Sequence, residues 1–232
     1  MQKAFCWKDA SSWPENWPGI EVGPESQEAH ELGLRFAQEY ESILAYHACR
    51  PLDISSYYKE GLRPARQSDL IKTAVKIFAG GQFSVISEED VLRAASELPG
   101  TADTKTFIVL DDRALLEFAN HYLLYGSEYI TAIAAGLSRK YGHDYTQYLK
   151  NFGRPTVFEL EIPLTWLTKS DLRVLAWQMS LAAFNDAIAR LVDFTVTLHR
   201  GIPPEYIKSH THPKVMQDTL TGIRCRENGE LA

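Results

Sequence analysis

The chain has 232 residues, of which 45% are hydrophobic and 23% charged, a composition typical of a globular protein and not of a disordered or fibrous one. Folding of a chain this long buries about 70% of the surface that the unfolded chain exposes, so one substantial core is available. The formal net charge of -6 disfavours a protein that holds nucleic acid through bulk positive charge, and leaves open only a local basic groove.

The cysteines Cys6, Cys49 and Cys225 are few and widely spaced, and no pair has the C-x-x-C spacing of a zinc or redox site. His210 and His212 are placed in a terminal loop, and we expect no metal site. No stretch has the apolar character of a signal peptide or a transmembrane segment. We therefore expect a soluble cytoplasmic protein that makes no contact with membranes.

We expect a single domain over residues 1–232, with an irregular N-terminal segment and a helix in 1–42, a core in 43–207 and a tail in 208–232. Apolar spacing, capping residues and turn residues predict helices and strands that alternate along the chain. The predicted helices are 25–42 with Ser26 as N-cap, 53–61 between Asp53 and Gly61, 87–98 with Ser87 as N-cap, one that begins at Asp111 or Asp112, and 171–189. The predicted strands are 43–49, 105–110, 157–162 and 193–199. Strands this far apart indicate an α+β fold.

No P-loop, dinucleotide-binding glycine motif, nucleophile elbow or HExxH zinc motif is present. Tyr122, Tyr125 and Tyr129 have helical spacing and share one helix face, which is more typical of a core than of a binding platform. Glu128 lies between them, and a carboxylate beside an aromatic face needs a partner or accepts a raised pKa. A structural salt bridge and a catalytic role both fit Glu128.

Three segments, in order, resemble the ADP-ribosyltransferase superfamily, especially its poly(ADP-ribose) polymerase and DarT-type toxin branches. The first is YHACRPLDISSYYKEGL, in which a strand ends in His, a small residue and Ser or Thr, and a later helix closes with Gly-Leu. In this chain His47, Ala48 and Cys49 stand at the three positions of the strand end, and Gly61 and Leu62 form the Gly-Leu pair that closes the helix. Cys49 replaces the hydroxyl residue of the family.

The second segment, TFIVLDDRALLEFANHYLLYGSEY, resembles the family's strand followed by a helix that starts after an acidic residue and ends in aromatics. No Tyr stands on the strand itself, so Tyr125 or Tyr129 would supply the ring that stacks on nicotinamide. The third, DFTVTLHRGIPPEYI, resembles the last strand, where the family places its catalytic Glu at the strand start. Asp193 occupies that position. The resemblance therefore leaves three alternatives, with Glu128 slightly preferred: Asp193 acts, Glu128 acts, or activity is lost.

The resemblance implies an ADP-ribosyltransferase-like split mixed β-sheet with flanking helices, and NAD as co-substrate. The activity it implies is transfer of ADP-ribose to DNA, RNA or protein by a bacterial or phage toxin or defence effector, with an antitoxin as a conceivable partner. The implied catalytic residues are Glu128, His47 and Asp193, and the implied NAD contacts are His47, Cys49, Arg50, Tyr58, Gly61, Tyr125 and Tyr129. For nucleic-acid acceptors, the nearest basic cluster is Arg63, Arg66, Lys72 and Lys76.

Three other functions stay open. The first keeps the fold and changes the reaction to that of an RNA 2′-phosphotransferase, which uses NAD without the catalytic Glu. The second is an inactive relative that binds a nucleotide or a partner protein, for which the departures at Cys49 and Asp193 would mark lost catalysis. The third is a structural or partner-binding protein without a ligand, in which the tyrosine-rich stretch is part of the core.

Overall fold

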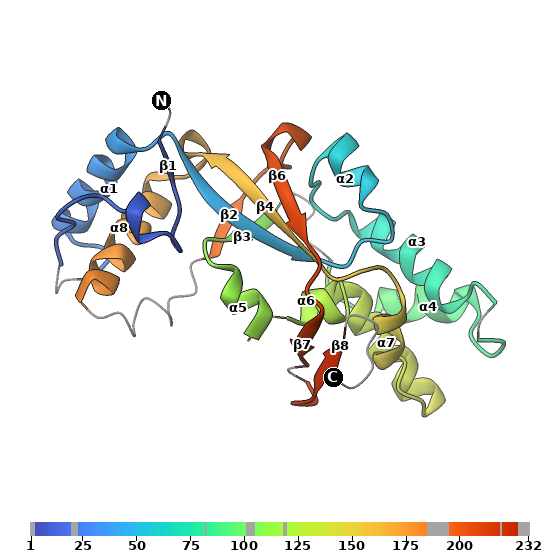
Figure 1. The fold of residues 1–232 in the computed structure, drawn as a ribbon. Coiled ribbons are helices and arrows are strands. Elements are labelled where there is room, and N and C mark those ends of the chain that lie inside the picture. Colours follow the sequence, from blue (N-terminus) through green and yellow to red (C-terminus); the bar gives the residue numbers. More distant parts are fainter. Residues whose placement is uncertain are drawn as a thin grey trace.

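A computed structural model of the chain describes residues 3–19, 23–81, 83–100, 105–117, 120–184, 195–218 and 220–226 (Figure 1). The helices are α1 (Gln27–Glu39), α2 (Ser55–Glu60), α3 (Gln67–Phe78), α4 (Glu88–Ser96), α5 (Asp112–Glu117), α6 (His121–Leu124), α7 (Glu128–Tyr141) and α8 (Lys169–Phe184), with short 3₁₀ turns η1 (Ala10–Ser12), η2 (Gln147–Asn151), η3 (Leu164–Trp166) and η4 (Pro204–Tyr206). The strands are β1 (Ala4–Phe5), β2 (Ser42–Cys49), β3 (Thr106–Val109), β4 (Thr156–Pro163), β5 (Thr195–Leu198), β6 (Ile207–Thr211), β7 (Val215–Gln217) and β8 (Arg224–Arg226). The α+β class expected from the sequence is confirmed.

The main sheet has the strand order β5-β3-β2-β4-β6, and β1 pairs in parallel with β2 at its start. All other pairs in this sheet are antiparallel. The β2–β4 ladder is continuous from Ser42↔Pro163 to Cys49↔Thr156, whereas β2 and β3 share the single pair Tyr46↔Val109. β2 is thus paired along its whole length with β4, but at only one position with β3.

The two faces of the sheet carry two separate hydrophobic clusters. Alternate residues of β2 point to opposite faces, so Ile43 and Ala45 belong to the first cluster, and Tyr46 and Ala48 to the second. The first cluster includes side chains of α1 and α8, and the second includes side chains of α3, α4 and α7. Figure 1 shows α1 and α8 together at one end of the molecule and α3, α4 and α7 at the other.

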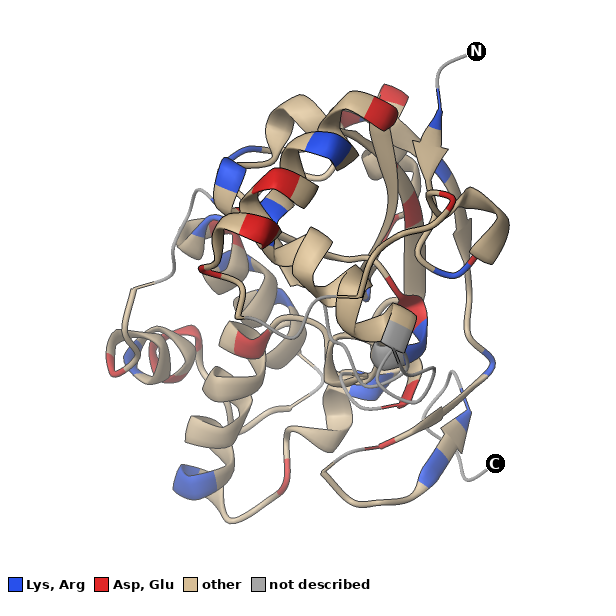
Figure 2. Cartoon of the chain, turned by 90° about the vertical axis from the view of Figure 1, so that its left-hand side faces the viewer, with Lys and Arg blue, Asp and Glu red and all other residues tan. Residues whose placement is uncertain are grey.

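The helix starts predicted from Ser26 and Ser87 are confirmed, whereas the helix predicted from Asp53 begins at Ser55 and the one predicted from Asp171 begins at Lys169. The Ser26 side chain accepts a hydrogen bond from the N–H of Ala29, and Ser87 forms a reciprocal capping box with Asp90. Both bonds satisfy N–H groups that the first turn of a helix leaves without a partner. Figure 2 shows acidic and basic residues interspersed along the helices that face the viewer.

The region expected to be a C-terminal tail differs from the expectation. His210 lies on β6 and His212 directly follows it, so their placement in a terminal loop was wrong. The reason is tertiary, because β6 pairs with β4 and residues 207–211 have little strand pattern of their own. Two further short strands, β7 and β8, form a hairpin in the region expected to be a tail. Among the described residues, no helix is long and apolar enough to cross a membrane.

Candidate functional site

His47 lies where β2 separates from β3. The ladder between these strands ends at Tyr46↔Val109, and one residue further along β2 the Nδ1 of His47 lies 2.8 Å from the main-chain oxygen of Phe107. A carbonyl only accepts, so we assign the proton to Nδ1 and leave Nε2 as an acceptor. The imidazole thereby takes the place of a ladder hydrogen bond at the fork of the sheet.

The environment keeps this imidazole neutral. Desolvation lowers the pKa of His47 from its ordinary value of 6.5, and the hydrogen bond to the Phe107 carbonyl opposes the shift without cancelling it. A neutral ring with Nδ1–H fixed presents Nε2 as an acceptor for a hydroxyl group. The half-buried side chain is therefore suited to bind a sugar hydroxyl and unsuited to act as a permanent cation.

Aromatic side chains continue from His47 across the sheet. His47 pairs with Phe158 of β4, and Phe158 pairs with His210 of β6, so the three side chains lie in one row on the face of the first cluster. Tyr57 stacks on Phe158, with ring centroids 4.9 Å apart and an interplanar angle of 25°. Tyr58 meets the same ring edge-on, and its hydroxyl lies 2.6 Å from the Nδ1 of His210.

Cys49 lies on the same face as His47 and contacts Tyr57. Burial raises the pKa of the Cys49 thiol to about 12, and the hydrogen bond with Tyr57 opposes that shift without cancelling it. The same burial raises the pKa of Tyr57. At neutral pH both groups are protonated. Cys49 is therefore a thiol that packs against Tyr57, and not a thiolate nucleophile.

Gly61 joins α2 to the segment that follows β5. It has φ 80° and ψ -176°, a conformation that is essentially restricted to glycine. A Cβ built there would lie 2.2 Å from the carbonyl oxygen of Ile202, and Leu62 and Ile202 exchange both of their main-chain hydrogen bonds at 2.8 Å. Close backbone contact thus explains the Gly-Leu pair, and it ties α2 to the segment after β5.

The start of β5 lies level with the fork. Thr195 pairs with Val109, which in turn pairs with Tyr46, so the first described residue of β5 is two strands, or about 10 Å, from the residue preceding His47. β2 and β5 run in the same direction, because each is antiparallel to β3. Asp193 is two positions earlier in the chain and lies outside the described residues.

Arg50 directs its guanidinium group into the protein. Its Nε donates to the carbonyl of Phe152 at 2.7 Å and its Nη1 to that of Leu123 at 2.8 Å, and Nη2 donates to that of Lys150. Three main-chain acceptors from two other segments fix the planar group. Arg50 therefore cross-links the loop after β2 to η2 and α6, a structural role that the resemblance did not suggest.

Glu128 lies at the first position of α7, and its side chain is 68% exposed. Its Oε1 accepts from the hydroxyl of Tyr122 at 3.0 Å and lies 3.1 Å from the Nε2 of His121. The buried residues of α7 pack in the second cluster, on the face of the sheet opposite to the side chain of His47. The structure does not bring Glu128 and His47 together.

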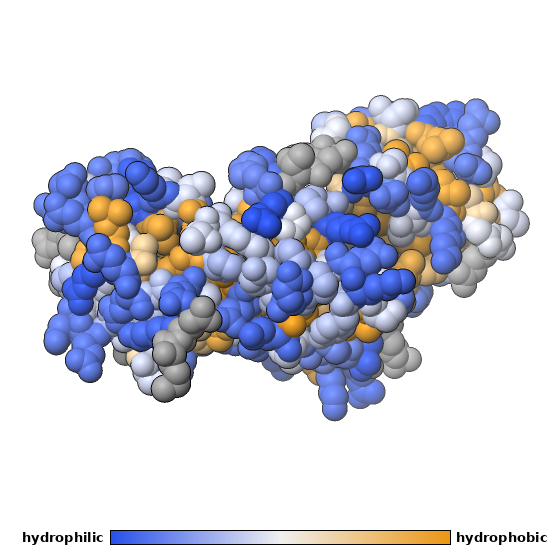
Figure 3. All heavy atoms as spheres, turned by 90° about the horizontal axis from the view of Figure 1, so that it is seen from above, coloured by the Kyte–Doolittle hydropathy of each residue, from blue (hydrophilic) through white to orange (hydrophobic). Residues whose placement is uncertain are grey.

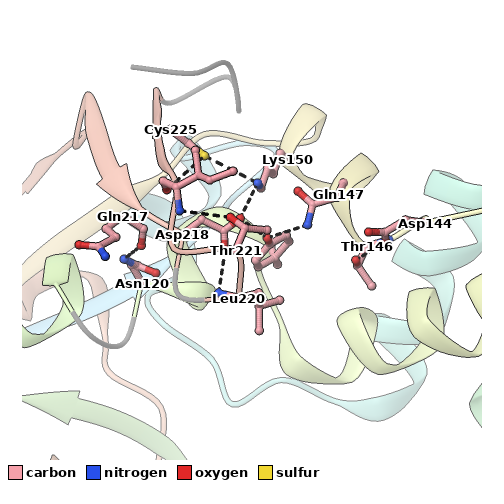
Figure 4. A network of polar contacts seen from close by, with 12 residues as sticks. Asn120, Asp144, Thr146, Gln147, Lys150, Gln217, Asp218, Leu220, Thr221 and Cys225 are labelled. Carbon is pink, nitrogen blue, oxygen red and sulfur yellow. Dashed lines mark hydrogen bonds and ion pairs between the residues drawn. The ribbon is translucent and has the colours of Figure 1, made fainter.

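Tyr125 and Tyr129 also pack in the second cluster, and both are buried. The hydroxyl of Tyr125 donates to the Asp218 carboxylate at 2.6 Å, and that carboxylate also binds the Nζ of Lys150 at 2.7 Å (Figure 4). The hydroxyl of Tyr129 donates to the carbonyl of Ala95. Both rings therefore belong to the second cluster, Tyr125 beside the hairpin of β7 and β8 and Tyr129 beside α4, on the face of the sheet opposite to the side chain of His47.

Tyr57, Phe158 and His210 were not assigned to the site from the sequence. Nothing in the sequence relates Tyr57, Phe158 or His210 to His47. The row depends on the registers of the β2–β4 and β4–β6 ladders, which only the folded sheet defines.

The proposed basic cluster is solvated and partly paired. Arg63 lies 3.2 Å from Glu60, and Lys72 lies 3.4 Å from Asp69. Over the part of the chain that the structure describes, no group of three or more His, Cys, Asp or Glu side chains is arranged to hold a metal ion. No protein-family model, curated protein or solved structure matches this chain.

Proposed function

We propose that the protein is an NAD-dependent ADP-ribosyltransferase with the split β-sheet of that superfamily, acting on a macromolecular acceptor in a toxin or defence system. One observation carries the proposal. The three segments that resemble the superfamily, far apart in the sequence, contain the three adjacent strands β2, β3 and β5. The motif histidine lies at the fork between two of them, level with the start of the third.

The chemistry fits the groups around the fork. Nε2 of His47 accepts a hydrogen bond from a ribose hydroxyl, and the Tyr57–Phe158 stack and Tyr58 provide aromatic surface next to it. In the reaction, the bond between C1′ of the ribose and the nicotinamide nitrogen breaks, and nicotinamide leaves with the bonding electron pair. A nucleophilic oxygen or nitrogen of the acceptor then bonds to C1′ and loses a proton. A carboxylate stabilises the developing positive charge or takes that proton.

We assign this carboxylate to Asp193 in preference to Glu128. Glu128 begins a helix whose buried face packs in the second cluster, on the other side of the sheet from the side chain of His47. Asp193 precedes β5, and the first described residue of β5 is level with the fork. We likewise leave Arg50, Tyr125 and Tyr129 out of the proposed NAD site, because their polar atoms hold the core together.

The test is release of nicotinamide from NAD by the purified protein in the presence of cell lysate. We expect release by the wild type, loss of most of it in His47→Leu and Asp193→Asn, and wild-type rates in Glu128→Gln. Circular dichroism and urea midpoints confirm that each variant is folded. Loss of activity in Glu128→Gln alone would overturn the assignment of the carboxylate.

Binding of NAD without turnover would instead identify an inactive, nucleotide-binding relative, which the replacement of the motif hydroxyl by the protonated Cys49 thiol favours. Calorimetry with NAD distinguishes the two. If the wild type neither releases nicotinamide nor binds NAD, the proposed function is wrong.

A further inference from the structure

A groove of about 760 Å³ lies at the end of β2 opposite to His47. The end of α1, the start of β2, the end of β4, η3 and the start of β6 form its walls. Figure 3 shows the surface hollowed between the part of the molecule built by α1 and α8 and its middle part. Its volume falls in the range of ligand sites, about 300–1,000 Å³.

The groove has apolar walls and a mostly acidic polar lining. Leu172 and Tyr206 are half-buried and provide apolar and aromatic surface, and the buried side chains of Tyr40, Leu164 and Leu167 lie beneath them. The charged lining residues are Glu41, Glu161, Glu205 and Lys208, so three carboxylates face one ammonium group.

The single lysine of the lining is already paired. The Nζ of Lys208 lies 2.5 Å from one oxygen of Glu161, and the Ser42 hydroxyl donates to the other at 2.8 Å. These two contacts lower the pKa of Glu161. The exposed side chains of Glu41 and Glu205 therefore remain as negative groups above apolar walls.

The aromatic rings around the groove already attract cations from within the chain. The Nζ of Lys3 lies 4.4 Å from the ring centroid of Tyr40, which lines the groove. The guanidinium of Arg200 lies 3.8 Å from the ring of Trp166, and Trp166 packs edge-on against Tyr206 of the groove wall. This part of the surface stabilises ammonium and guanidinium groups on aromatic faces.

We propose that this groove binds a basic and hydrophobic segment of a partner protein, with Lys or Arg side chains against Glu41 and Glu205 and apolar side chains against Leu172 and Tyr206. The net charge of -6 adds a long-range attraction for such a partner. Ser42 and Cys49, at the two ends of β2, are about 24 Å apart along the strand, so this site is separate from the fork. The proposal does not depend on the proposed function.

The test is fluorescence anisotropy with a short labelled peptide of alternating Arg and Leu, and with a Glu and Leu peptide of the same length. We expect the Arg-Leu peptide to bind and the Glu-Leu peptide not to bind. In the double variant Glu41→Gln and Glu205→Gln, the affinity falls about tenfold. The matched control, Glu28→Gln and Glu97→Gln, has the same change of charge outside the groove and keeps nearly full affinity.

A second variant tests the groove itself. Ala37 is exposed at the groove wall, so Ala37→Arg adds an internal cation without disturbing the core, and we expect it to weaken binding of the Arg-Leu peptide. Absence of binding by the wild type would overturn the proposal, as would equal binding of both peptides. Equal affinity losses in the groove and control double variants would show that general charge, and not the groove, attracts the peptide.

Discussion

His47 and Phe107 are joined by a hydrogen bond of 2.8 Å between the imidazole Nδ1 and a main-chain oxygen, directly beyond the last pair of the β2–β3 ladder. A side chain thus satisfies a strand carbonyl that the separated partner strand leaves open. The same bond fixes the tautomer that makes Nε2 an acceptor. The hydrogen bond between His47 and Phe107 therefore stabilises the sheet at this point and also sets the tautomer that the proposed reaction needs.

Replacing His47 with Leu removes the donor and leaves the Phe107 carbonyl without this partner. We expect the free energy of unfolding to fall by about 1–3 kcal/mol. The control is His199→Leu, because His199 is exposed just after β5, and its effect should stay within about 0.5 kcal/mol. Urea unfolding measures both, and equal effects of the two substitutions would contradict a structural role for the bond.

Gly61→Ala should destabilise the protein strongly. The added Cβ would meet the Ile202 carbonyl at 2.2 Å in a conformation that only glycine adopts easily, so we expect a loss of about 3 kcal/mol or more. Gly142 provides the matched control, because it has φ 69° and nothing within 4 Å of an added Cβ. Gly142→Ala should cost only about 1–2 kcal/mol. Similar losses in thermal or urea unfolding would show that the Ile202 contact is unimportant.

The buried pair of Lys150 and Asp218 holds the hairpin of β7 and β8 against η2. The two side chains are 8% and 0% exposed, with Nζ and Oδ2 2.7 Å apart. Lys150→Met leaves a buried carboxylate without its cation, and we expect a loss of about 3–5 kcal/mol. Lys72→Met, which breaks the exposed pair with Asp69, should cost about 0.5 kcal/mol or less. If Lys150→Met unfolds at the same urea concentration as Lys72→Met, the pair contributes little.

The same carboxylate makes stability depend on acid pH. Hydrogen bonds from Lys150 and Tyr125 outweigh burial and lower the pKa of Asp218 from 3.8 to about 2. A lowered carboxyl pKa stabilises the native state above the unfolded value, and this contribution is lost as the pH falls from about 4 through 2. It amounts to about 2–3 kcal/mol at neutral pH. Asp218→Asn should therefore lower stability at pH 7 and flatten its decline between these pH values, and an unchanged slope in urea titrations would refute the assignment.

Cys49 should react slowly with alkylating reagents in the folded protein. Its thiol pKa of about 12 leaves little thiolate at pH 8, so we expect labelling by iodoacetamide to be at least about a hundredfold slower than in the urea-unfolded chain. Peptide mapping by mass spectrometry follows each cysteine separately, with the half-exposed Cys6 as the internal reference. Native labelling of Cys49 as fast as that of Cys6 would indicate an accessible, ionisable thiol.

Local chemistry in the sequence determined much of the secondary structure. Ser26 and Ser87 mark helix starts because their side chains satisfy N–H groups within the same turn. Gly61 marks a helix end because its conformation excludes other residues, and the apolar run around His47 predicts a buried strand. Each of these signals acts over a few residues, so it can be recognised without knowledge of the rest of the fold.

Only the tertiary structure decided which of these residues meet. The resemblance assigned Glu128 and His47, from two different segments, to one site, but the sheet separates them, because alternate residues of a strand point to opposite faces. The sequence shows that Arg50 is a cation, but not whether it binds a ligand or the protein itself. In the folded protein its guanidinium group binds three main-chain carbonyls. His210 joins Phe158 and His47 through strand registers that join residues far apart in the chain, and such long-range pairing leaves no local pattern to read.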